Sequence, residues 1–306
     1  MKGALLLFLG FSTQALGAGL NSYADLVVKD SGATPRSGVR VTYLGTNGYQ
    51  FESSGHALLV DPYFTRINLS QIAIGTSVQP DSQRIEDAMK HLVPKADAIV
   101  ITHGHVDHLL DVPILMRRTR ARLVASRTAV QLAQRAGTLP SLCDVVSAGS
   151  VRRIGPWKIQ ALAATHDRLF CCVPFAGEPR GTEPPRHAAD WVCGEPLAYL
   201  IETGKQRIYV DSGGTPAQLP PSEHVDLAIL GMALPDSRAR LPAALERLQP
   251  RYILPSHQDN FFRPLGAGFQ FGPLTDFSRV RRDCEQANHG RLILLDYFRS
   301  WTLPKK

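Results

Sequence analysis

Apolar residues in this chain recur with two different periods, beginning at Val39. Short alternating or continuous apolar runs bounded by Gly and polar residues indicate strands, whereas apolar positions three and four apart indicate helices. The expected strands cover residues 39–44, 49–52, 57–60, 98–101, 122–125, 150–153 and 157–163, and the expected helices cover residues 84–92, 109–117 and 128–135. Strands and helices that alternate in this way predict an α/β fold.

The pattern repeats in the second half of the chain. Residues 51–61 and 201–211 both read as hairpins that end in Asp, and residues 96–101 resemble residues 225–230. Two similar halves, each a mixed sheet with helices, predict a duplicated α/β sandwich with its functional site where the halves meet.

Two long loops interrupt this regular pattern. Residues 168–196 are rich in Pro, Gly and Cys, and residues 259–273 combine Gly with several Phe. Loops of this length in a compact domain are commonly lids or binding loops, although a surface excursion without a role is the alternative.

The N-terminus has the pattern of an export signal. Lys2 precedes an apolar run over residues 4–11, and small residues follow as far as Ala18. This pattern predicts a signal peptide over residues 1–18 and a periplasmic or secreted protein, with a membrane-surface anchor as the alternative. The apolar run is too short to span a bilayer, so we expect no transmembrane helix. Small and polar residues 19–37 predict a linker, which leaves a single domain over residues 38–302.

The net charge and the cysteine content give little information about function. The formal net charge is +7, but the Lys and Arg residues are scattered, which favours a solvated surface over a nucleic-acid-binding one. None of the five cysteines forms a Cys-x-x-Cys pair. In an oxidising compartment Cys193 could pair with Cys171 or Cys172, and buried free thiols are the alternative.

The strongest chemical signal is the sequence His-Gly-His-Val-Asp-His, which directly follows the expected strand 98–101. Residues two apart in an extended turn point the same way, so His103 and His105 could hold one metal ion. Asp107 and His108 open the next turn and would face a second ion. Zinc accepts imidazole and carboxylate ligands.

Further ligands are available where other strands end. His166, Asp211 and His257 each follow an apolar run. Together with Asp61, these residues and the His103–His108 motif resemble the metallo-β-lactamase superfamily in identity, order and spacing.

This resemblance implies a four-layer αβ/βα sandwich with a metal site at one edge. It implies that His103, His105 and His166 bind one zinc ion, that Asp107, His108 and His257 bind the other, that Asp211 bridges them, and that Asp61 supports the ligand loop. Mn²⁺ or Fe²⁺ would also suit such ligands. The expected chemistry is hydrolysis by a metal-bridging hydroxide whose proton Asp107 and Asp211 take or orient.

Three short motifs indicate a particular branch of this superfamily. Residues 41–48, 59–64 and 255–257 resemble the branch that contains L-ascorbate 6-phosphate lactonase and N-acylphosphatidylethanolamine phospholipase D. That likeness implies cleavage of an ester, lactone or phosphodiester in a small-molecule or lipid-like substrate. The Phe-rich loop would contact an apolar portion, and Arg66 or Arg263 would hold an anionic group. The alternatives are an exported β-lactamase-like amide hydrolase and a non-catalytic metal-binding protein.

Overall fold

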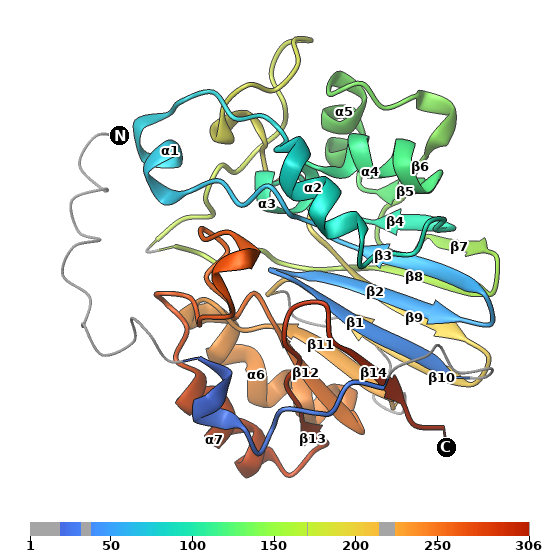
Figure 1. Ribbon diagram of the computed structural model, residues 1–306, viewed down its shortest axis with the longest axis vertical. Coiled ribbons are helices and arrows are strands. Elements are labelled where there is room, and N and C mark those ends of the chain that lie inside the picture. The colour runs from blue at the N-terminus through green and yellow to red at the C-terminus, as the bar shows by residue number, and fades with distance from the viewer. Residues whose placement is uncertain (1–18, 32–37, 170, 214–223, 306) are drawn as a thin grey trace.

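Two β-sheets packed face to face form the centre of the protein (Figure 1). The structure is a computed structural model that describes residues 19–31, 38–169, 171–213 and 224–305. The first sheet has the strand order β14-β1-β2-β3-β4-β5-β6. Its strands are β1 (Val39–Gly45), β2 (Gly48–Ser53), β3 (His56–Val60), β4 (Ala98–Val100), β5 (Arg122–Ala125), β6 (Cys143–Val145) and β14 (Ser300–Leu303).

The second sheet has the order β13-β12-β11-β10-β9-β8-β7. Its strands are β7 (Val151–Ile154), β8 (Trp157–Ala163), β9 (Leu197–Thr203), β10 (Gln206–Val210), β11 (Leu227–Gly231), β12 (Tyr252–Ser256) and β13 (Arg291–Leu292). Alternation along each strand determines which layer a side chain enters. In β10, for example, Ile208 and Val210 pack between the sheets, whereas Tyr209 packs against the helices outside.

Helices cover the outer face of each sheet (Figure 1). The first sheet carries α1 (Leu69–Ile74), α2 (Ser82–Met89), α3 (Val106–Leu109), α4 (Val112–Thr119) and α5 (Arg127–Arg135), and the second carries α6 (Pro235–Leu248) and α7 (Phe277–Ala287). Three apolar clusters hold the layers together, one between the sheets and one under each helical layer. The predicted four-layer αβ/βα sandwich is therefore confirmed.

The predicted duplication is visible in the strand pairing. β2 and β3 pair antiparallel, and β3 pairs parallel with β4. The later hairpin β9–β10 is also antiparallel, and β10 pairs parallel with β11. Because parallel strands end at the same sheet edge, the residues that follow β4, β10 and β12 are brought to one side of the molecule.

The helix expected over residues 109–117 is α4, which begins three residues later than expected. The single turn α3 precedes it, with Asp111 at the junction. The Asp111 carboxylate accepts hydrogen bonds from the backbone N–H groups of Phe64 and Thr65, at 2.6 and 2.8 Å. Asp111 thus ties the start of α4 to the loop after β3, a long-range contact that helical periodicity alone does not reveal.

The N-terminal segment differs from the predicted linker. Residues 19–31 pack on the second sheet, where Val27 forms a parallel bridge with Leu294 and the Leu294 N–H donates to the Leu26 carbonyl at 2.9 Å. The Tyr23 ring contacts Phe277 edge-on at 4.7 Å. Residues 19–31 are therefore part of the packed domain. The predicted signal peptide and the rest of the predicted linker, residues 32–37, lie outside the described residues.

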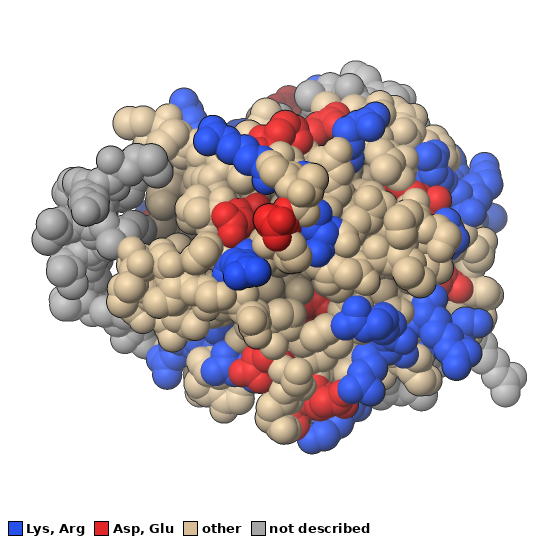
Figure 2. Space-filling view, turned by 90° about the horizontal axis from the view of Figure 1, so that it is seen from above, with Lys and Arg blue, Asp and Glu red and all other residues tan. Residues whose placement is uncertain are grey.

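Charged residues of both signs are distributed over the surface. Figure 2 shows Lys and Arg in separate groups, with Asp and Glu between them, on the face seen from above. Within the described ranges, no helix is both long and apolar enough to cross a bilayer.

All five cysteines are free, and Cys193 is buried whereas Cys171 and Cys172 are exposed. No disulfide therefore joins Cys193 to either of them in this structure.

Candidate metal centre

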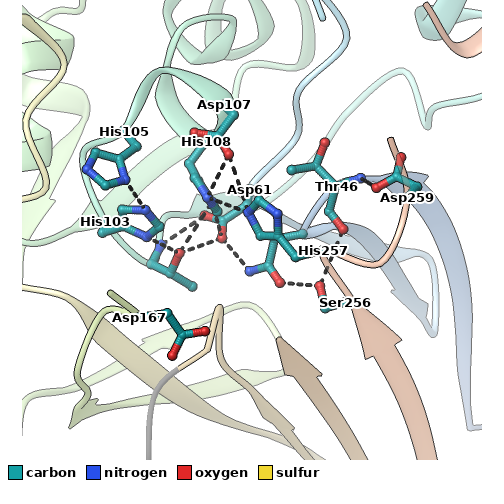
Figure 3. Close-up of polar contacts among 12 residues, drawn as sticks. Thr46, Asp61, His103, His105, Asp107, His108, Asp167, Ser256, His257 and Asp259 are labelled. Atoms are coloured by element: carbon teal, nitrogen blue, oxygen red, sulfur yellow. Dashed lines mark hydrogen bonds and ion pairs between the residues drawn. The ribbon is translucent and has the colours of Figure 1, made fainter. Parts of the chain in front are cut away.

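The ligand motif begins immediately beyond β4, at the edge where the two halves meet (Figure 3). Between the two histidines, the Gly104 N–H donates to the Cys193 carbonyl at 3.0 Å. A Cβ at residue 104 would collide with the Val192 carbonyl oxygen. The backbone of the long loop 168–196 thus packs directly against the motif, and only glycine fits between His103 and His105.

This close approach gives a testable prediction. Gly104→Ala would push the motif away from Val192 and misplace both flanking histidines, so zinc affinity should fall by about tenfold or more, a loss typical of misaligned metal ligands. Zinc titration of the purified variant measures this. Gly266→Ala is the matched control, because a Cβ there meets nothing within 4 Å. Equal affinity in the two variants would contradict the steric argument.

The first group of potential ligands is His103, His105 and His166, which the structure brings together as predicted. Nε2 of His103 lies 2.8 Å from Nδ1 of His105. The His166 ring lies edge-on to both, with centroids 4.6 and 4.7 Å away. One ligand atom from each residue lies within 4.8 Å of the others, so three nitrogens converge on a common point.

The second group is Asp107, His108 and His257, also as predicted. Nε2 of His108 and Nε2 of His257 lie 3.1 Å apart. Oδ2 of Asp107 lies 3.5 Å from the first nitrogen and 3.3 Å from the second. Two nitrogens and one carboxylate oxygen therefore surround a second point.

The remaining ring nitrogens determine which atoms carry lone pairs. Nε2 of His105 donates to the Pro174 carbonyl at 2.9 Å. Nδ1 of His108 lies 2.9 Å from Oδ2 of Asp61, and Nδ1 of His166 lies 2.7 Å from the Asp167 carbonyl. Each of these nitrogens faces an oxygen atom and carries the ring proton. The other nitrogen of the same ring then has a lone pair that can bind a metal ion.

The tautomer of His103 is determined by its hydrogen bonds in the same way. The Thr102 hydroxyl donates to Oδ2 of Asp61 at 2.6 Å, so it accepts from Nδ1 of His103 at 3.1 Å. Nε2 of His103 and Nδ1 of His105 therefore face each other with two lone pairs. Lone pairs this close repel unless a cation lies between them, and tetrahedral zinc takes such imidazole ligands. The donor set fits a metal ion.

Burial sets the protonation states that a metal requires. Burial, reinforced by neighbouring histidines, lowers the pKa of His103 well below its usual value, that of His105 to about 3 and that of His166 to about 4. Burial alone would raise the pKa of Asp107, but His108 and His257 hold it well below its usual range. At neutral pH His103, His105 and His166 are therefore neutral and Asp107 is ionised, which is the state in which each can bind a metal ion.

Asp61 lies beneath the ligands, in the supporting position expected from the sequence. Besides His108, it accepts from the Thr102 N–H at 2.8 Å and from Nδ2 of Asn47 at 2.6 Å. The Ser256 hydroxyl in turn donates to Oδ1 of Asn47. This chain of hydrogen bonds joins the ends of strands from both sheets under the site, and it explains why Asn47 and Ser256 occur in the motifs.

Asp211 differs from its predicted position. Neither of the two groups formed by the described residues includes it. Its Oδ1 accepts from the N–H groups of Gly213 and Gly231, at 3.0 and 2.9 Å, and burial raises its pKa to about 7. The physical reason is alternation, because Asp211 continues the phase of Tyr209 in β10 and therefore faces α6. Its carboxylate lines a small cavity beside Leu241 of α6.

A further buried carboxylate, that of Asp167, lies outside both groups. Asp167 follows His166 in sequence, is 3% exposed, and is shown in Figure 3 on the side of the histidines opposite Asp107. Nη2 of Arg240 donates to its Oδ1.

The two long loops do approach the site. The Phe175 ring lies edge-on to His105 at 6.2 Å, and the Phe261 ring lies edge-on to His257 at 5.0 Å. These contacts agree with the binding-loop interpretation. They give each metal group an apolar border.

Of the two arginines predicted to bind an anionic group, Arg66 cannot serve as expected. The side chain of Arg66 is 0% exposed, and its Nη1 donates to Oδ2 of Asp259 at 2.8 Å. Arg66 is therefore structural, which contradicts the predicted contact with substrate. Arg263 lies at the surface of the Phe-rich loop and donates to Oε1 of Gln270.

The buried Arg66–Asp259 pair positions the last ligand. Oδ1 of Asp259 accepts from the Thr46 N–H at 3.0 Å, and the Thr46 carbonyl accepts from the His257 N–H at 2.9 Å. His257 has a φ of +57°, a left-handed conformation that is strained for a residue with a Cβ. The network holds His257 in this conformation.

Comparison with known proteins agrees with this geometry. Residues 56–257, more than half of the chain, match the family described as beta-lactamase superfamily domain, and the chain belongs to that family. A UPF0173 metal-dependent hydrolase from Desulforamulus reducens is 25% identical over 232 residues, which cover 73% of this chain and 86% of that protein.

Two solved structures are similar in fold. Igni18, described as a novel metallo hydrolase from Ignicoccus hospitalis, superposes with a TM-score of 0.59 and 17% identity over 88% of this chain and 100% of its own. The metallo-beta-lactamase fold protein YhfI from Bacillus subtilis has a TM-score of 0.57 and 16% identity over 87% of this chain and 99% of its own. Both likenesses concern the fold.

Proposed function

We propose that this beta-lactamase superfamily member is a metal-dependent hydrolase that binds two divalent ions, zinc in the first instance. The observation that carries the proposal is the set of ligand atoms that converge in each group, with nitrogens 2.8 and 3.1 Å apart. His103, His105 and His166 would hold one ion, and Asp107, His108 and His257 the other. The names of the relatives, which are metal-dependent hydrolases, support the same reading.

Ions at such a site supply an activated water and a Lewis acid. The residues of the chain supply the rest. Asp107 is ionised and its side chain is 14% exposed, so it can accept a proton from a water at the rim. Asp61 and the Pro174 carbonyl fix the tautomers of His108 and His105. Phe175 and Phe261 border the site with apolar surface.

The proposed bond type is an ester, lactone or phosphodiester. It rests on the likeness of residues 41–48, 59–64 and 255–257 to the lactonase and phospholipase D branch. The apolar border made by Phe175 and Phe261 supports a substrate with an apolar, small-molecule or lipid-like portion. An anionic portion would have to bind residues other than Arg66.

A substrate panel with metal quantified tests this proposal. The zinc-loaded protein should hydrolyse at least one of a p-nitrophenyl ester, a lactone series and bis(p-nitrophenyl) phosphate, and activity should be lost with chelator and restored by zinc. Hydrolysis of nitrocefin alone would instead support a β-lactamase-like amide hydrolase. Full metal occupancy without turnover on any class would support a non-catalytic metal-binding protein.

Metal removal should also change stability. Ligands that bind only the folded state stabilise it by about 2.7 kcal/mol when present at 100 times the dissociation constant. We therefore expect dialysis against EDTA to lower Tm and zinc, but not magnesium, to restore it, since Mg²⁺ prefers oxygen ligands. Thermal unfolding followed by circular dichroism measures this, and an unchanged Tm would argue against a preformed metal centre.

We further propose that the protein is exported, on the pattern of Lys2 and the apolar run over residues 4–11. Expression of the full chain in a Gram-negative host and N-terminal sequencing of the product tests it. Cleavage near Ala18 and recovery from the periplasm are expected, whereas an intact Met1 in the cytoplasmic fraction would refute export.

A further inference from the structure

Two neighbouring cysteines lie at the surface of the long loop 168–196. Cys171 and Cys172 are both exposed and both free. Leu169 and Cys172 form an antiparallel bridge, in which the Leu169 N–H donates to the Cys172 carbonyl at 3.0 Å and the Cys172 N–H donates to the Leu169 carbonyl at 3.4 Å. The two adjacent thiols therefore lie at a hydrogen-bonded turn of the loop, where a small molecule can reach them.

The other three thiols are less reactive. Cys193 and Cys284 are buried, and burial raises the pKa of each to about 12. Burial also raises the pKa of Cys143, whose Sγ donates to the Leu139 carbonyl at 3.4 Å. Because the thiolate is the form that attacks a disulfide, these three residues are poor nucleophiles at neutral pH.

A positively charged side chain lies beside the exposed pair. Nε of Arg168 donates to Oδ2 of Asp236 at 3.0 Å, and the same guanidinium interacts electrostatically with Cys171. A positive charge next to a cysteine favours nucleophilic attack by its sulfur. The pair thus offers an attacking thiol, Cys171, and a second thiol in the next residue that can displace the product.

The turn is connected to the first metal group on both sides. The potential ligand His166 lies three residues before Leu169. On the other side, two residues after Cys172, the Pro174 carbonyl accepts from Nε2 of His105 at 2.9 Å. A change of the backbone at the two cysteines would therefore disturb the hydrogen bond that fixes the tautomer of His105.

We propose that Cys171 and Cys172 form a thiol–disulfide exchange site that takes a low-molecular-weight disulfide, and that its oxidation weakens zinc binding at the first group. The Cys171 thiolate attacks the small disulfide, forms a mixed disulfide and releases one small thiol. The Cys172 thiolate then attacks the Cys171 sulfur, which joins the two cysteines and releases the second small thiol. Two electrons pass from the cysteines to the small disulfide, and the two cysteine protons leave with the released thiols.

The product would distort the loop. Neighbouring Cα atoms are about 3.8 Å apart, whereas the Cα atoms of disulfide-bonded cysteines are usually about 4.4–6.8 Å apart. A disulfide between neighbours therefore strains the backbone at the Leu169–Cys172 bridge and is easily reduced again. The exchange itself is independent of the proposed function, whereas its effect on zinc binding rests on that function.

The first experiment follows the thiols by peptide mapping. The reduced full chain is treated with oxidised glutathione, its remaining thiols are alkylated, and the trypsin digest is analysed by mass spectrometry. Trypsin releases Cys171 and Cys172 together in residues 169–180, and it releases Cys193 in residues 187–205. A disulfide between the two neighbours is thus distinguishable from a bond to Cys193.

We expect peptide 169–180 of the wild type to lose two hydrogens and to carry no glutathione. Cys143→Ser is the matched control and should behave identically, because it keeps both neighbouring thiols. Cys172→Ser should instead keep glutathione attached to Cys171, since the thiol that displaces it is missing. An unmodified wild-type peptide, a retained glutathione adduct in the wild type or a cross-link to residues 187–205 would each overturn the proposal.

The second experiment measures zinc affinity after glutathione has been removed by gel filtration. Oxidation should weaken zinc binding to the wild type at least about tenfold, and reduction with a phosphine should restore it. The double variant Cys171→Ser/Cys172→Ser, treated in the same way, should keep its affinity. Equal zinc affinity of the oxidised and reduced wild type would overturn the link to the metal centre. Absence of zinc from the reduced wild type would refute the proposed function, and the peptide map would still decide whether the two cysteines exchange.

Discussion

Replacing His105 with alanine is expected to remove stable metal binding at the first group and to lower hydrolysis by at least about 100-fold, since even residues that only support a ligand change affinity by 10- to 100-fold. His105 has both roles, because Nδ1 faces Nε2 of His103 while Nε2 anchors the loop through Pro174. Zinc content of the purified variant and turnover on the best substrate of the panel measure the two losses.

His224→Ala provides the matched control for this substitution. His224 is exposed and its backbone carbonyl, which the substitution retains, accepts from Nη1 of Arg207. We expect it to keep wild-type zinc content and turnover. If His105→Ala retained either property, the assignment of the first group would be wrong, and if His224→Ala lost them, the effect of removing a histidine would not be specific to the site.

The sequence predicts the local parts of this site well. The His103–His108 motif is contiguous, so the turn that follows β4 determines its geometry. His166 and His257 are not contiguous with it, yet each follows a strand. β8 runs in the same direction as β10 and β12, because both β8 and β10 pair antiparallel with β9, and strands that run in the same direction end at one edge. Hairpin periodicity was equally informative, because β2–β3 and β9–β10 are local structures whose pairing the alternation of apolar residues determines.

The sequence does not determine the direction in which an individual side chain points. Asp211 follows a strand, as a ligand would, but the phase of β10 sends it towards α6, and that phase depends on which face Tyr209 buries. A shift of one residue in a strand reverses every side chain. Arg66 is a similar case, since a surface arginine and a fully buried one look alike in sequence until its partner Asp259, 193 residues later, is placed beside it.

The N-terminal segment shows the same limit on a smaller scale. Residues 26–28 make only a short bridge to Leu294, so their few apolar residues produce no recognisable period. Their burial depends on apolar side chains of α7 and β13, which come much later in the chain. A short run of this kind is distinguishable from a linker only when the surface that receives it is known.

Asp259→Asn is expected to have the largest effect on stability. The Arg66 and Asp259 side chains are both 0% exposed, and removing one charge from such a pair leaves the other buried and uncompensated, which costs about 3–5 kcal/mol of unfolding free energy. Asparagine keeps the size of the side chain and an oxygen that accepts from Thr46, but its amide nitrogen replaces the oxygen that accepts from Arg66 and Tyr297. The loss therefore combines the charge with these two hydrogen bonds. Urea unfolding followed by fluorescence measures it.

The same substitution should reach the metal centre, because the network continues from Asp259 through Thr46 to the strained backbone of His257. We therefore expect zinc at the second group to bind at least about tenfold more weakly in Asp259→Asn, with the first group unaffected. Asp87→Asn is the control, because Asp87 forms an exposed ion pair with Lys90, and exposed pairs contribute little. Loss of stability with unchanged zinc affinity would show that the buried ion pair does not influence metal binding. Loss of both would show that one buried pair fixes the core and the last ligand together.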